Sequence, residues 1–279
     1  MKYKLLLLLP LLCSSCQKAD KSNTIFTSFD LIKNLAANII GDKFEIENIV
    51  PSGTEPHDFE LTAEKLVYLT ECKASFINGL GFESWTNNLP SEVTTKMYDT
   101  SLEVTPMYID GKLDPHIWLN PLNAITQMEN ITYATVKIDP DNKDYYLANL
   151  ETCKASFTTL DAECMQKANG FTNKNIVVSH AAYGYMAERY GLNQIYINGI
   201  NADEEPTTKT LTEIIDKVKE LHITTIFTEE LISPEIAEKI ASETGVKIEM
   251  LNTLETIDEG EDYISLMKDN FNKLEKACK

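Results

Sequence analysis

Three of the four histidines in the chain lie in motifs that could bind a metal ion. His57 lies in a loop that reads VPSGTEPHDF, His116 in DPHIWLNP just before a helix, and His180 in VVSHAAYGY directly after an apolar strand. Imidazole nitrogens are common ligands of zinc and other transition metals. His222 lies at the end of a predicted helix, where a dipolar side chain is favourable for local reasons. We therefore treat His57, His116 and His180 as the candidate ligands.

The first half of the chain alternates β-type runs with helical patterns. Residues 24–27, 45–50, 75–78 and 96–98 predict strands, and residues 31–40 and 63–69 predict helices between them. This alternation favours a parallel sheet flanked by helices.

The second half repeats this pattern. Strands are predicted at 176–179, 194–197, 224–228 and 247–251, and helices at 182–190, 208–221 and 233–244. The last helix has Ser233 as its expected N-cap, Pro234 at its first position and Gly245 just past its end. Ligands bind beyond the carboxyl ends of parallel strands, so His57 and His180 are expected at binding edges, one in each half.

A helical region separates the two halves. One helix is expected to start at Asn120-Pro121, and a second starts at Asp139-Pro140 and runs without Gly or Pro to about Ala168. We therefore predict an α/β fold of two lobes, each a parallel-rich sheet flanked by helices, joined by a long rigid helix. The predicted lobes span residues 24–138 and 171–279, and the linking helix spans 139–170. Because such a helix is stiff, closure on a ligand should be small.

The charge balance excludes one class of partner. The chain has 25 Lys and Arg against 43 Asp and Glu, which gives a formal net charge of −18. Such a surface repels phosphate backbones and attracts cations, so we expect no nucleic-acid partner.

The first residues are typical of an export signal. Lys2 and Lys4 precede a leucine run that is too short to cross a bilayer, and Ser14-Ser15-Cys16 follows. We predict a lipoprotein signal peptide at 1–15, lipidation of Cys16 and a polar tether at 16–23. Cys13 stands where the lipoprotein pattern prefers leucine. Lipid chains on Cys16 would hold the protein at the outer face of the cell membrane or in the periplasm.

The other four cysteines, Cys72, Cys153, Cys164 and Cys278, do not form a dense disulfide framework. Cys153 and Cys164 fall about 16 Å apart along the predicted long helix, beyond the roughly 7 Å Cα separation that a disulfide allows. The chain has no CxxC motif, which argues against a thiolate zinc site.

Several motifs together resemble one protein family. VPSGTEPHDFE, NGLGFESW, DPHIWLNP, SHAAYGYMAERYGL and GINADEEPT occur in the order found in the metal-binding subunits of bacterial zinc and manganese ABC transporters. This family is the cluster A-I solute-binding proteins. The resemblance covers nearly the whole mature chain. It implies a non-enzymatic, monomeric lipoprotein that delivers a divalent metal ion to an ABC transporter permease.

The resemblance also implies the ligands, which lie between the lobes. His57, His116 and His180 match the family's histidines, and an acid after the last strand matches the fourth ligand. That acid is Glu255, with Asp258 as its rival. Three imidazoles and a carboxylate form a good tetrahedral zinc set, whereas manganese prefers more carboxylate and water. The segment 105–113, TPMYIDGKL, lacks the His-rich loop of many zinc-binding relatives.

There are three alternatives, one from the same family and two from other functional classes. A manganese carrier of the same family would share the site, a zinc hydrolase would need an open position for water, and an adhesin would need a host partner. The chain has no HExxH motif, and a fourth ligand closes the site. We therefore expect a zinc carrier and not an enzyme.

Overall fold

The computed structural model describes residues 20–200 and 206–279. The predicted export signal, Cys16 and the first part of the tether lie outside the described residues. In the part of the chain that is described, no helix combines the length and apolar content needed to cross a bilayer.

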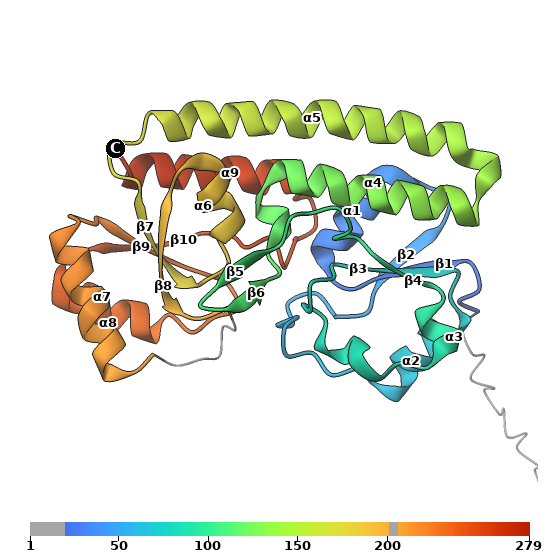
Figure 1. The fold of residues 1–279 in the computed structure, drawn as a ribbon, viewed down its shortest axis with the longest axis horizontal. Helices are drawn as coiled ribbons and strands as arrows, with labels where there is room; N and C mark the ends of the chain where they lie inside the picture. The colour runs from blue at the N-terminus through green and yellow to red at the C-terminus, as the bar shows by residue number, and fades with distance from the viewer. Residues whose placement is uncertain (1–19, 201–205) are drawn as a thin grey trace, which may run out of the picture.

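Two four-stranded parallel sheets form the two lobes (Figure 1). The strand order is β2-β1-β3-β4 in the first sheet and β10-β9-β7-β8 in the second, and β5 pairs with β6 in a separate antiparallel hairpin. The strands are β1 (Thr24–Thr27), β2 (Glu45–Asn48), β3 (Ala74–Ile77), β4 (Met97–Asp99), β5 (Met107–Ile109), β6 (Lys112–Asp114), β7 (Asn175–His180), β8 (Asn193–Asn198), β9 (Thr225–Thr228) and β10 (Lys247–Met250).

Helices flank both sheets and connect them. The α-helices are α1 (Asp30–Ile40), α2 (Ala63–Glu71), α3 (Ser91–Thr94), α4 (Pro121–Ile138), α5 (Lys143–Asn169), α6 (Gly184–Tyr190), α7 (Thr208–Glu220), α8 (Glu235–Thr244) and α9 (Tyr263–Ala277). The 3-10 helices among the described residues are η1 (Ser84–Asn88), η2 (Ile117–Leu119) and η3 (Pro140–Asn142).

The long helix α5 runs over both sheets along the length of the molecule (Figure 1). It packs against α1, α4 and α9. One hydrophobic core continues from the first lobe, which contributes Ile25 and Leu35, into the second, which contributes Val178 and Phe227. Separating the lobes would expose this apolar surface to water, so the two sheets are held in a fixed relation.

The predicted fold class is confirmed, and most predicted strands agree with the structure to within two residues. α1 forms because its apolar residues repeat with helical spacing and point into the core. The last predicted helix differs at its start. The N-cap of α8 is Pro234 and the helix begins at Glu235, because Ser233 makes only a long 3.5 Å contact to the first turn.

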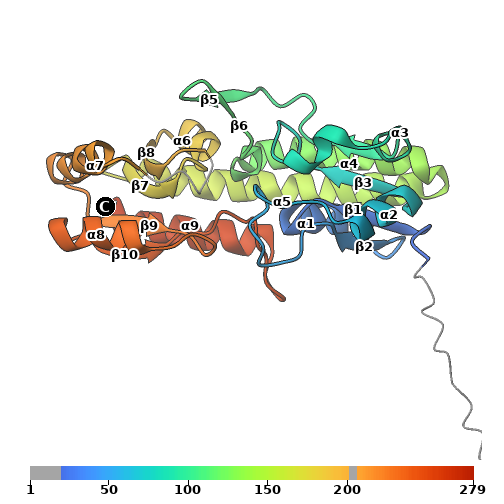
Figure 2. The same cartoon turned by 90° about the horizontal axis from the view of Figure 1, so that it is seen from below.

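The β5–β6 hairpin spans residues 107–114, where the sequence predicted no strands. Asp110 and Gly111 form its turn, both with positive φ (50° and 78°), which suits a tight Asp-Gly hairpin turn. Figure 2 shows the hairpin projecting from one face of the molecule. Its contacts reach the second lobe: the Tyr185 hydroxyl accepts a hydrogen bond from the Met107 amide at 2.9 Å.

The four cysteines of the described chain are free and buried. Cys153 and Cys164 both lie on α5, as the sequence predicts, and form no disulfide with each other.

Candidate metal centre

Four side chains that are distant in sequence meet at one point between the two lobes. His57, His116, His180 and Glu255 each direct one potential ligand atom there, and these atoms lie within 4.8 Å of one another. Three of the four residues are buried and His57 is half-buried.

The spacing of these atoms fits a tetrahedral ion. Nε2 of His116 lies 3.1 Å from Nε2 of His57 and 3.3 Å from Nε2 of His180. Oε1 of Glu255 lies 3.7 Å from Nε2 of both His57 and His116. Ligands 2.0–2.1 Å from a tetrahedral zinc ion are about 3.3–3.4 Å apart, so a zinc ion fits with small adjustments.

Each ligand comes from a segment that ends or follows a regular element. His180 is the last residue of β7, in the middle of the second sheet, and His57 lies in the loop after β2. His116 is the N-cap of η2, and Glu255 lies in the segment between β10 and α9. Sequence reasoning placed His180 just after its strand, whereas the strand extends through it.

Two buried carboxylates that sequence reasoning did not single out lie behind two of the histidines. Oδ1 of Asp114 lies 2.8 Å from Nδ1 of His116 and accepts its backbone N–H at 3.0 Å. Oε2 of Glu229 lies 2.5 Å from Nδ1 of His180. A carboxylate at Nδ1 keeps a proton on that nitrogen, so Nε2 is the nitrogen that presents a lone pair to a metal ion once the imidazole is neutral.

A signal for both acids exists in the sequence. Asp114 is part of the DPHIW motif, and Glu229 directly follows β9, so the rule that places ligands at carboxyl strand ends would have found it.

Each of the four side chains offers the centre one atom that can bind a cation. Nε2 of His116 and Nε2 of His180 lie 3.3 Å apart, and Oε1 of Glu255 is buried without a hydrogen bond within the described chain. An unpaired buried acceptor is costly, and a cation at this point would satisfy all of these atoms together. The donor set therefore fits a metal ion.

The protonation states differ between the histidines. Burial holds the pKa of His116 well below its ordinary value, so this imidazole is neutral. Burial also lowers the pKa of His180, but the negative charge of Glu229 outweighs it and raises this pKa to about 9. Burial raises the pKa of Asp114 to about 7.

Aromatic rings form the wall behind the ligands. The Phe82 ring lies 4.4 Å from the His57 ring, and the Trp118 ring lies 5.4 Å from the His116 ring. Trp118 is fully buried and its Nε1 donates to the Thr253 carbonyl at 2.7 Å. Trp118 thus packs beside the site and helps to exclude water.

The remaining candidates lie elsewhere. Asp258, the rival of Glu255, is exposed and is not part of the four-residue cluster. His222 is exposed beyond the end of α7 and also lies outside the cluster.

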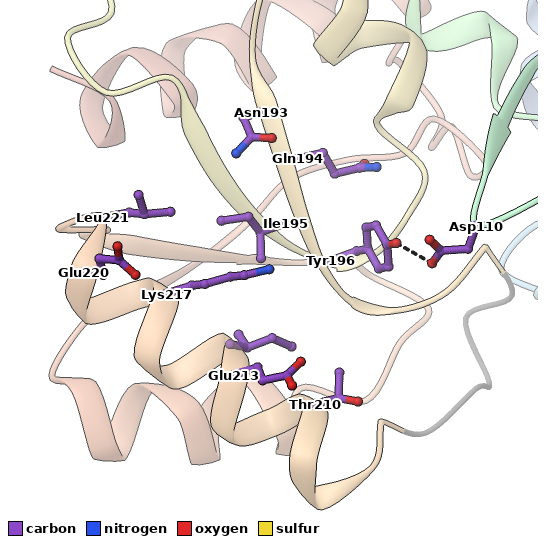
Figure 3. Close-up of a pocket in the computed structure, with 11 residues that line it drawn as sticks. Asp110, Asn193, Gln194, Ile195, Tyr196, Thr210, Glu213, Lys217, Glu220 and Leu221 are labelled. Carbon is purple, nitrogen blue, oxygen red and sulfur yellow. Dashed lines mark hydrogen bonds between the residues drawn. The ribbon is translucent and has the colours of Figure 1, made fainter.

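A cavity of about 570 Å³ lies along β8 and α7 (Figure 3), and none of the four candidate ligands lines it. Its lining includes Tyr196, Lys217 and Glu213, and the Tyr196 hydroxyl donates to Asp110 of the hairpin at 2.5 Å. Among the described residues no histidine lines this cavity, so the cavity is not the metal site despite its volume.

Comparison with known proteins gives one consistent result. The model of the family described as "ZnuA: Zinc-uptake complex component A periplasmic" matches residues 25–277. The high-affinity zinc uptake system protein ZnuA of Bacillus subtilis (strain 168) is 31% identical over 290 residues, which cover 95% of this chain and 90% of that protein.

Solved structures agree with this match. The AdcAII protein of Streptococcus pneumoniae has a TM-score of 0.85 at 30% identity, over 93% of this chain and all of that one. The laminin-binding protein Lmb of Streptococcus agalactiae, described as bifunctional with adhesin and metal-transporting activity, has a TM-score of 0.87 at 30% identity, over 92% of this chain and 99% of that one.

Proposed function

The chain belongs to the ZnuA family of zinc-uptake components, and from this premise we propose that it captures Zn²⁺ outside the cytoplasm and delivers it to an ABC permease. The observation that carries the proposal is the convergence of three imidazoles and one carboxylate, within 4.8 Å of one another, at a buried point between two sheets. The relative from Bacillus subtilis is named as a protein of a high-affinity zinc uptake system, which supports the proposal.

His57, His116, His180 and Glu255 are the zinc ligands in this proposal. Each supplies one N or O donor, and together they fill a tetrahedral shell. Asp114 and Glu229 hold two of the imidazoles in the tautomer that presents Nε2 to the ion. The aromatic wall keeps water from competing for the ion.

The filled shell favours carriage over catalysis. A catalytic zinc keeps one position open for water or substrate, whereas four protein ligands leave none. The ligand set also favours zinc over manganese, because manganese prefers oxygen ligands and a higher coordination number. The likeness to Lmb does not lead us to propose adhesion, since no feature of this site distinguishes an adhesin from a carrier.

Export and anchoring complete the proposal. The signal-like residues 1–15 and Cys16 support a lipid anchor at the outer face of the cell membrane. Labelling of the expressed protein with a radioactive fatty acid, in the wild type and in Cys16→Ser, tests the anchor. Label in the wild type alone is expected, and equal label in both would reject Cys16 as the attachment site.

The function itself is tested by metal content and competition. We expect protein purified without added metal to take up one equivalent of Zn²⁺, as measured by titration calorimetry, and to retain it in a hundred-fold excess of Mn²⁺. Absence of saturable Zn²⁺ binding, or displacement of Zn²⁺ by Mn²⁺, would contradict the proposal.

A further inference from the structure

One buried acid close to the metal centre is not one of its ligands. Glu83 ends the loop of residues 78–83, NGLGFE, which joins β3 to η1 and is called here the Glu83 loop. Glu83 is only 3% exposed and lies outside the four-residue ligand cluster. Across residues 20–200 and 206–279, no basic side chain forms an ion pair with it. A buried carboxylate without a counter-charge is costly unless hydrogen bonds compensate for the lost water, so its partners indicate its role.

Both oxygens of this carboxylate accept amides from the start of the same loop. Oε1 accepts the N–H of Asn78 at 2.7 Å, and Oε2 accepts the N–H of Gly79 at 3.1 Å. Between these ends the backbone has a positive φ at three successive residues, Gly79 (92°), Leu80 (53°) and Gly81 (78°). Such a φ is unfavourable for leucine, so the carboxylate helps to hold the loop in a shape that it would not adopt by itself.

The Glu83 loop places an aromatic ring against one of the ligands. The N–H of Phe82 donates to the Gly79 carbonyl at 3.1 Å, so the turn of the loop fixes the position of Phe82. The buried Phe82 ring lies 4.4 Å from the His57 ring. Within the described chain, Phe82 supplies the one aromatic contact that His57 receives from outside the ligand set. The shape of the loop therefore limits where the His57 ring can lie.

The start of the Glu83 loop supports a second ligand. Nδ2 of Asn78 donates at 2.9 Å to the carbonyl of Pro115, the residue directly before His116. Oδ1 of Asn78 accepts from Nε2 of Gln127 on α4 at 2.9 Å. Asn78 and Gln127 are both fully buried. Because Glu83 accepts the Asn78 amide, the side chain that shapes the loop also supports the segment that carries His116.

These two sets of contacts end at ligands whose Nε2 atoms lie 3.1 Å apart. We propose that Glu83 is a positioning residue of the metal centre, because its carboxylate closes the Glu83 loop and so sets the spacing of two ligands. It acts on His57 through the ring of Phe82. It acts on His116 through the side chain of Asn78. This inference rests on the proposed function, since it concerns how the zinc ligands are held.

Glu83→Gln tests the role of the carboxylate directly. Glutamine keeps the size of the side chain but offers one acceptor oxygen, so one loop amide then faces an NH₂ group. We expect zinc affinity, measured by competition with a zinc indicator, to fall about tenfold, the lower end of the loss when a group that supports a metal ligand is removed. The control Glu92→Gln, at an exposed position on α3 of the same lobe, should match the wild type.

The visible spectrum of the Co²⁺-loaded protein separates positioning from stability. The d–d bands of Co²⁺ respond to the arrangement of the ligands around the ion. We expect these bands to shift or weaken in Glu83→Gln and to stay unchanged in Glu92→Gln. If Glu83→Gln lowers only the denaturant midpoint of the metal-free protein, and keeps the wild-type zinc affinity and cobalt bands, Glu83 contributes to stability alone and the proposal is wrong.

Phe82→Leu tests the contact with His57 while leaving the carboxylate in place, and it carries the test alone if Glu83→Gln does not fold. We expect a several-fold loss of zinc affinity and a shift of the cobalt bands. In the double variant, the combined loss should be smaller than the product of the two single losses, because both changes disturb the same contact. Losses that multiply in full, or a Phe82→Leu variant with wild-type affinity and spectrum, would overturn the proposal.

Failure of this proposal can be told apart from failure of the proposed function. A wild type that does not bind one equivalent of Zn²⁺ refutes the proposed function. A wild type that binds Zn²⁺, together with folded Glu83→Gln and Phe82→Leu variants that bind it equally tightly, refutes only the positioning role of Glu83.

Discussion

The carboxylate of Glu229 lies 2.5 Å from Nδ1 of His180, and both side chains are at least 96% buried. The two residues come from adjacent parallel strands, His180 from the end of β7 and Glu229 from just beyond β9. The Glu229 carboxylate fixes the orientation of the His180 ring from the side opposite the metal position. It also favours a proton on this imidazole, which must leave when zinc binds.

Removing the Glu229 carboxylate should weaken zinc binding without unfolding the protein. We expect Glu229→Ala to lower zinc affinity about 100-fold and Glu229→Gln about tenfold, because glutamine can still accept the Nδ1 proton. Competition with a zinc indicator measures this. The matched control is Glu243→Gln, an exposed position on α8; an affinity loss there equal to that of Glu229→Gln would reject the specific role.

Zinc affinity should rise with pH. The pKa of His180 is raised to about 9, so in the metal-free protein this imidazole carries a proton at neutral pH that zinc binding must release. Apparent affinity should therefore increase by up to about tenfold per pH unit between pH 7 and 8.5 and level off above about 9. Calorimetry in buffers of different ionisation enthalpy counts the released proton. A flat affinity over this range would contradict the protonated His180.

The fourth ligand can be assigned by comparing two acids on one segment. Glu255→Gln should lower zinc affinity by at least about tenfold, because it removes the only carboxylate of the four-residue cluster. Asp258→Asn should leave affinity unchanged, since Asp258 is exposed and outside the cluster. The reverse order of effects, measured by the same indicator competition, would transfer the ligand role to Asp258.

A methyl group at Gly184 should disturb Asp114. A Cβ built on Gly184 would lie 2.4 Å from Oδ2 of Asp114, so one of them must move. We expect Gly184→Ala to lower the free energy of unfolding by about 1–3 kcal/mol and to weaken zinc binding as Asp114 shifts away from His116.

Gly170→Ala is the control for that substitution. Its Cβ would meet only the Lys167 carbonyl, at 3.3 Å, on an exposed helix end. We expect a change within about 0.5 kcal/mol by denaturant unfolding. If both alanines behave alike, close packing of α6 on Asp114 does not matter to the site.

Much of the fold could be predicted from sequence because its elements carry local signals. The alternation of apolar strands and helical stripes is a local pattern, and it predicts both parallel sheets. The absence of Gly and Pro after Asp141 predicts α5 in the same way. The β5–β6 hairpin was missed because its strands have three residues each, too few for a periodic signal, although the Asp110-Gly111 pair marks its turn.

The site was only partly accessible to the same reasoning. His57, His116 and His180 stand out because histidine is rare in this chain and each sits in a motif. The place of Glu229 directly after β9 marks it as a candidate, but only the pairing of β7 with β9 shows that it meets His180.

Zinc K-edge X-ray absorption of the loaded protein tests the coordination directly. Four side chains holding one ion predict a shell of four N or O atoms at about 2.0–2.1 Å, with the outer-shell scattering of three imidazole rings. A sulfur scatterer at about 2.3 Å, a six-oxygen shell, or fewer than three imidazoles would contradict the assignment.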